Sequence, residues 1–115
     1  MAEKRHLNPP TIAKAAAEDF LPENRKFQGV ASLAVSPGGR LWATWYAGIA
    51  PAEDENNYVV IATSPDSGKS WNEVLYVACE NPVRCFDPEI WLDPQGRLWA
   101  FWAQTIGQDG REAGV

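Results

Sequence analysis

Histidine and cysteine are scarce in this 115-residue chain, which contains only His6, Cys79 and Cys85. Two cysteines and one distant histidine cannot complete the tetrahedral ligand set of a zinc site, so we expect neither a metal nor a cofactor. A lone histidine in the leading tail also argues against a histidine-based lyase or hydrolase centre. We expect His6 to be an exposed tail residue.

Long apolar runs and basic stripes are also missing. No run approaches the roughly 20 apolar residues that span a bilayer, and no apolar stretch follows the charged N-terminus as in a secretory signal. We therefore expect a cytoplasmic protein, in which Cys79 and Cys85 are reduced rather than closed into a small disulfide loop. A net charge of −5 and scattered Lys and Arg exclude nucleic acid as a partner, leaving neutral or weakly charged ligands.

An internal repeat organises the rest of the chain. Shifting the sequence by 57 residues aligns residues 36–47 with residues 93–104, and seven of the twelve positions are identical, including two Trp in each copy. Each copy has a short apolar run, a Pro-x-Gly-Arg turn and an aromatic second run, which predicts a β-hairpin. Because both faces of the second run are apolar, we expect stacked sheets, as in a sandwich or propeller, with Trp42, Trp45, Trp99 and Trp102 in the core.

Further β runs complete the first copy. The expected strands are residues 30–35, 41–46, 58–63 and 71–77 in the first copy, and residues 89–92 and 98–103 in the second. Four antiparallel strands in about 57 residues match one blade of a β-propeller, so the predicted class is all-β. Residues 113–115 would open the third strand of the second blade. Before the first blade, Thr11 and the following alanines favour a short helix over residues 12–20 that packs on the rim.

The turn between the third and fourth runs carries a specific motif. It matches the Asp-box pattern Ser/Thr-x-Asp-x-Gly-x-Ser/Thr-Trp at every defined position, through Ser64, Asp66, Gly68, Ser70 and Trp71. The Asp66 carboxylate can accept backbone N–H bonds inside the turn, Gly68 can adopt a left-handed conformation, and Trp71 can pack beneath.

With this motif inside the repeat, the chain resembles the sialidase (BNR/Asp-box, neuraminidase-like) superfamily of β-propellers from about Phe27 onward. The resemblance implies a lead-in over residues 1–26 and a partial propeller over 27–115, with blade 1 at about 27–78 and the start of blade 2 at about 84–115. It also implies that the Asp-box is structural and lies away from the active site. The functional face would collect residues 27–29, 48–57, 84–89 and 104–110.

The resemblance also suggests candidate site residues. Where true sialidases carry a Phe/Tyr-Arg-Ile-Pro segment, Gln28 stands in place of the arginine that binds the sialic acid carboxylate, so sialic acid is not the expected substrate. The acid/base aspartate corresponds in position to Asp54, with Glu53 and Glu55 beside it; a solvated acidic loop is the alternative. Arg84 and Asp87 either contact ligand or form a structural salt link.

The expected function is therefore that of a carbohydrate-active, glycoside hydrolase-like or lyase-like propeller with an incomplete active site. The alternative is a non-catalytic Asp-box module that binds a glycan or a protein. Two blades leave apolar faces exposed, so either chains associate through these faces, for example three chains in a six-bladed ring, or the reading frame is truncated. We expect truncation.

Overall fold

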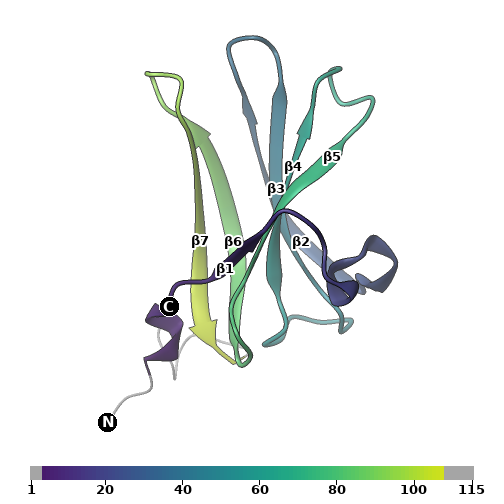
Figure 1. The fold of residues 1–115 in the computed structure, drawn as a ribbon, viewed down its shortest axis with the longest axis vertical. Helices are drawn as coiled ribbons and strands as arrows, with labels where there is room; N and C mark the ends of the chain where they lie inside the picture. The colour runs from purple at the N-terminus through teal and green to yellow at the C-terminus, as the bar shows by residue number, and fades with distance from the viewer. Residues whose placement is uncertain (1–3, 108–115) are drawn as a thin grey trace.

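The computed structural model describes residues 4–107, which form an all-β structure of two antiparallel sheets (Figure 1). The strands are β1 Thr11–Ala13, β2 Phe27–Val35, β3 Leu41–Gly48, β4 Tyr58–Ser64, β5 Asn72–Ala78, β6 Val83–Leu92 and β7 Leu98–Ile106. Three short 3-10 turns precede β2: η1 Arg5–Leu7, η2 Glu18–Phe20 and η3 Pro22–Asn24. One sheet has the strand order β1-β5-β4-β3-β2, and the other is the β6–β7 hairpin.

Strands β2 to β5 form the antiparallel meander that the sequence predicts, and the all-β class is confirmed. The hairpin β6–β7 likewise contains both predicted strands of the second copy. The predicted strand at residues 113–115 lies outside the described residues. No helix of residues 4–107 has the length and apolar character needed to cross a membrane.

The predicted helix over residues 12–20 is wrong. Thr11–Ala13 is a strand that pairs antiparallel with β5, where Thr11 lies opposite Ala78, and residues 4–107 contain no α-helix. The physical reason is that the outer edge of β5 presents unpaired backbone N–H and C=O groups, which the segment satisfies by pairing. An isolated helix of this length is marginal in water, so alanine propensity does not compete with this tertiary pairing.

The rest of the N-terminal segment is fastened to the sheet by one arginine. Arg25 donates two hydrogen bonds to the Glu73 carboxylate, from Nη1 and Nη2, each at 2.6 Å. Its Nε also donates to the Tyr58 hydroxyl at 3.0 Å, and the Phe20 ring stacks on Tyr58 at a centroid distance of 4.0 Å. Phe20 and Arg25 of the N-terminal segment thus cover part of one face of β4 and β5.

The two copies of the repeat share an equivalent hydrogen bond in the turn and an equivalent β-bulge in the first strand. In the first turn the Ser36 hydroxyl accepts a hydrogen bond from Trp42 Nε1 at 3.3 Å, and in the second the Asp93 carboxylate accepts one from Trp99 Nε1 at 2.9 Å. The first strand of each copy also contains a β-bulge, at Val30 (φ 35°) and at Asp87 (φ 45°), which are 57 residues apart. The repeat is therefore structural as well as sequential.

The hairpin packs face to face against β2 and β3, and the core lies between the two sheets. Its buried members are Tyr46, Val59, Ile61, Val77, Cys85, Phe86 and Ile90. A second cluster covers the other face of β4 and β5.

Four tryptophans were expected in the core, and the prediction is wrong for Trp99, which is 43% exposed. The reason is that no element of residues 4–107 covers its side of the hairpin. His6 is half-buried in η1 rather than exposed, and Gln104 Nε2 of β7 donates a hydrogen bond to its carbonyl oxygen.

Candidate functional site

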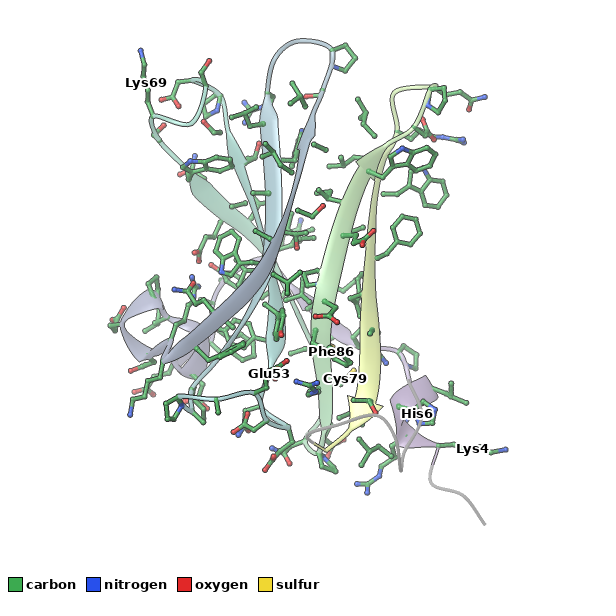
Figure 2. All side chains as sticks on the ribbon, turned by 180° about the vertical axis from the view of Figure 1, so that it is seen from behind. Lys4, His6, Glu53, Lys69, Cys79 and Phe86 are labelled. Atoms are coloured by element: carbon green, nitrogen blue, oxygen red, sulfur yellow. The ribbon has the colours of Figure 1, made fainter. Side chains whose placement is uncertain are left out.

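The Asp-box turn and the acidic loop lie at opposite ends of the five-stranded sheet. Figure 2 shows Lys69, in the Asp-box turn, at one end and Glu53, in the loop between β3 and β4, at the other. Antiparallel strands impose this separation, because β4 runs from the loop at Tyr58 to the turn at Ser64. The start of β6 at Val83 lies near Glu53, so the candidate residues gather at that end.

The Asp-box turn is held by its own side chains. Ser70 donates from its backbone N–H and its hydroxyl to the Asp66 carboxylate, at 2.8 and 2.6 Å, and these bonds lower the pKa of Asp66. Ser64 Oγ donates to Asp66 at 2.9 Å and accepts from the N–H of Gly68, whose φ of 90° is left-handed. Trp71 is 41% exposed, and its indole lies against Gly68 of the turn, with Nε1 3.8 Å from the place of a Cβ on that glycine. All of these groups serve the turn itself.

At the other end a polar cluster forms around Arg84, which is 5% exposed. Its Nη1 donates to Asn57 Oδ1 at 2.8 Å and to Glu53 Oε1 at 3.1 Å. Tyr46 OH donates to the same Glu53 oxygen at 2.5 Å, and the guanidinium carbon lies 3.9 Å from the centroid of the Phe86 ring. We call Tyr46, Glu53, Asn57 and Arg84 the Arg84 cluster.

The electrostatics of the Arg84 cluster keep its charges paired. The hydrogen bond from Tyr46, followed by the bond and charge of Arg84, lowers the pKa of Glu53 against its partial desolvation. Burial, and then the bond to Glu53, raises the pKa of Tyr46 far above its usual range. At neutral pH the cluster therefore contains a guanidinium, a carboxylate and a protonated phenol. A carboxyl group that stays ionised cannot serve as a general acid.

The other two acidic loop residues have different surroundings. Asp54 accepts hydrogen bonds from the Asn56 backbone N–H at 2.9 Å and from Asn56 Nδ2 at 3.2 Å, and its own N–H donates to Asn57 at 3.1 Å. Glu55 lines a hollow of about 90 Å³ beside Phe20. The hydrogen bonds of Asp54 are therefore local to the loop and do not reach Arg84.

Gln28 and Asp87 make no hydrogen bond to the Arg84 cluster. Gln28 Oε1 accepts a hydrogen bond from Trp45 Nε1 at 2.9 Å, and both residues line an open hollow of about 390 Å³ at β2. Asp87 sits exposed in the β6 bulge and has no hydrogen bond or ion pair among residues 4–107, although its charge contributes to the raised pKa of Tyr46. Of the candidates, the structure therefore brings together only Glu53 and Arg84 directly.

Another hollow, of about 320 Å³, lies between the N-terminal segment and the turn from β5 to β6. Its lining residues are Arg5, Asn8, Pro9, Thr11, Cys79, Glu80, Asn81 and Val83. Asn81 Nδ2 donates to Asn56 Oδ1 at 2.8 Å, which links this hollow to the acidic loop. We call it the Asn81 hollow.

Sequence reasoning missed the Asn81 hollow because the N-terminal lead-in was expected to pack on the rim without chemistry of its own. It also missed Tyr46, and it included Asn57 only as the last residue of the 48–57 loop, without a role; both residues complete the Arg84 cluster. The one local signal for Asn57 is its place at the end of the polar loop, directly before a fully buried strand. A polar residue there must find a buried partner.

The two cysteines face each other as free thiols with their sulfur atoms 3.6 Å apart. Burial is the main cause that raises the pKa of both Cys79 and Cys85. Neither thiol is therefore a reactive thiolate at neutral pH.

Residues 4–107 gather no set of three or more His, Cys, Asp or Glu side chains that could hold a metal ion. Comparison of the chain with protein-family models, with curated proteins and with solved structures gives no match.

Proposed function

We propose that the two sheets are successive blades of a sialidase-like Asp-box β-propeller. Three observations support the proposal: the full Asp-box between β4 and β5, the 57-residue repeat with its equivalent turn bonds and bulges, and the face-to-face packing of the hairpin on β2 and β3. Propeller blades are four-stranded antiparallel sheets that pack in this manner around an axis.

We propose further that the ligand is a neutral or weakly charged carbohydrate. The observation that carries this is the Asn81 hollow, which lies at the end of the sheets away from the Asp-box turn. Its volume of about 320 Å³ is at the lower end of the range for small-molecule sites. Asn8, Thr11 and Asn81 are among its lining residues, and amide and hydroxyl side chains of this kind suit the hydroxyl groups of a sugar.

In this proposal the described residues bind a glycan rather than cleave it. Hydrolysis by the common route needs a pair of carboxyl groups, one of them protonated. Glu53 has a lowered pKa, and the carboxylate of Asp54 is occupied by Asn56. The Tyr46–Glu53 contact resembles a tyrosine nucleophile with its glutamate, but the pKa of Tyr46 is raised, which is opposite to activation.

The test is binding of the full chain to an array of neutral, uronate-containing and sialylated glycans, followed by calorimetry on the best ligand. Asn81→Ala should weaken binding about tenfold, the cost of roughly one hydrogen bond. Asn72→Ala, at the opposite end of the sheet, is the matched control and should leave the affinity unchanged. Absence of glycan binding, or equal weakening by both variants, would contradict the proposal, and turnover of any glycan by the chain would contradict its binding-only part.

A further inference from the structure

The two outer faces of the sheet pair are both apolar and exposed. On the hairpin, the face turned away from β2 and β3 carries Trp91, Trp99 and Phe101, which are 52%, 43% and 51% exposed. On the five-stranded sheet, the face turned away from the hairpin carries Leu33 and Val35 of β2, which are 59% and 52% exposed. Single exposed apolar residues are ordinary, but contiguous patches mark interaction surfaces.

The buried contact between the hairpin and the five-stranded sheet indicates what kind of surface could pack on the two exposed faces. The inner face of the hairpin contributes Ile90, Ala100 and Trp102, which pack on a sheet face that includes Ala34 and Trp42. Side chains alternate across a strand, so Trp91 and Trp99, which are cross-strand partners, lie on the opposite side of the hairpin from Ile90.

Because of the repeat, each exposed face has the same kind of residues as one side of the buried contact between the hairpin and the five-stranded sheet. Under the 57-residue shift, the inner face of the hairpin corresponds to the exposed face of β2 and β3. The matched pairs are Ile90 with Leu33, Ala100 with Ala43, and Trp102 with Trp45. Equivalent positions differ sharply in environment, since Ile90 is 6% exposed and Leu33 is 59% exposed.

The other half of the contact is matched in the same way. The sheet residues Ala34 and Trp42, which the hairpin covers, correspond to Trp91 and Trp99 on the bare face of the hairpin. One molecule therefore exposes two faces that match the two sides of its own internal contact: the exposed face of β2 and β3 resembles the inner face of the hairpin, and the bare face of the hairpin resembles the covered face of the sheet.

We propose that a second copy of this chain docks head to tail, with the Trp91–Trp99 face of one copy packing on the Leu33–Val35 face of the next. The second copy is the occupant, in place of the truncation that was expected from the sequence alone, because the new contact continues the internal one with corresponding residues. The N-terminal segment covers the β4 and β5 part of the sheet and leaves the β2 part open. Because the two faces differ, the contact is heterologous and buries every face only when a ring closes.

Light scattering coupled to size exclusion tests the proposal on the full chain. The wild type should run as a defined oligomer. Trp99→Arg, which blocks the hairpin face, and Leu33→Arg, which blocks the sheet face, should each run as a monomer. Ile12→Arg is the matched control, because Ile12 is 56% exposed but lies in β1 at the far edge of the sheet, and it should keep the wild-type mass.

Mixing the two blocked variants gives the sharpest outcome. Each variant retains the face that the other lacks, so an equimolar mixture should form a heterodimer and nothing larger. A monomeric wild type, a Leu33→Arg variant that remains oligomeric, or a mixture that stays monomeric would each overturn the proposal. Far-UV circular dichroism checks the fold of each variant, and Trp91→Arg replaces Trp99→Arg if the latter misfolds.

This assembly does not rest on glycan binding. Asn81→Ala should therefore keep the wild-type mass, and a chain that binds no glycan would leave the expected oligomer unchanged.

Discussion

Replacing Glu73 by glutamine removes one charge from the contact that fastens the N-terminal segment to the sheet while keeping the shape of the side chain. Glu73 accepts both hydrogen bonds from Arg25 and a third from the Tyr76 hydroxyl at 2.8 Å. The side chains of Arg25 and Glu73 are 3% and 23% exposed, so the guanidinium is left nearly buried without its counter-charge in the variant.

Breaking a buried pair from one side costs about 3–5 kcal/mol, and the partial exposure of Glu73 places the expected loss at about 2–3 kcal/mol. Urea unfolding of Glu73→Gln, followed by tryptophan fluorescence, should show this loss as a lower midpoint. Replacing both partners, as Arg25→Met with Glu73→Leu, should cost much less because no charge remains buried. A loss below about 0.5 kcal/mol for Glu73→Gln would refute the reasoning, because that is the range of an ordinary surface change.

The same contact sets a pH dependence. The hydrogen bond from Arg25, aided by that from Tyr76, lowers the pKa of Glu73 below its unfolded value of about 4.3. The contribution of Glu73 to stability is therefore fully present above the unfolded pKa and is lost as the pH falls through the folded pKa. The difference in unfolding free energy between wild type and Glu73→Gln should accordingly shrink at acidic pH, and a difference that is unchanged there would contradict the assignment.

Three further predictions concern the turns, the bulge and the Arg84 cluster. Asp66→Ala should lower the melting temperature in calorimetry, because the Ser70 N–H and hydroxyl lose their acceptor, and an unchanged melting temperature would argue against the turn bonds. Val30→Gly should raise stability by about 0.5–1 kcal/mol in urea unfolding, since Val30 has φ 35° and is 57% exposed; a loss of stability would show that the bulge is unstrained. Arg84→Met should cost about 2–3 kcal/mol because buried Asn57 loses its charged partner, and Glu53→Gln should cost less because its side chain is 44% exposed; the reverse order in urea unfolding would contradict the assigned burial.

Local signals in the sequence predicted the hairpins and the Asp-box turn correctly. The bonds of Asp66 reach no further than four residues, and Gly68 adopts its left-handed conformation within the same turn. Interactions this short depend little on the rest of the molecule. The segment after Thr11 shows the opposite case, because the open edge of β5, more than sixty residues away, made it a strand instead of a helix.

The candidate site could be predicted only in outline. The acidic loop and the start of β6 were expected at one end of the sheets, and they lie there. Which carboxylate contacts Arg84 depends on the shape of the loop, in which Glu53 accepts a hydrogen bond from Arg84 while Asp54 accepts hydrogen bonds from Asn56. The sequence contains three adjacent carboxylates and no local pattern that distinguishes them.

The amino-acid sequence by itself determined the repeat, the alternation of apolar side chains and the turns, because these follow from spacing and from residues a few positions apart. Only the tertiary structure decided which copy of a repeated residue is covered. Trp42 packs against the hairpin, whereas Trp99, its counterpart in an identical Arg-Leu-Trp-Ala segment, is exposed. Burial is a property of what lies opposite a side chain, and identical segments acquire different roles when only one of them has a sheet opposite.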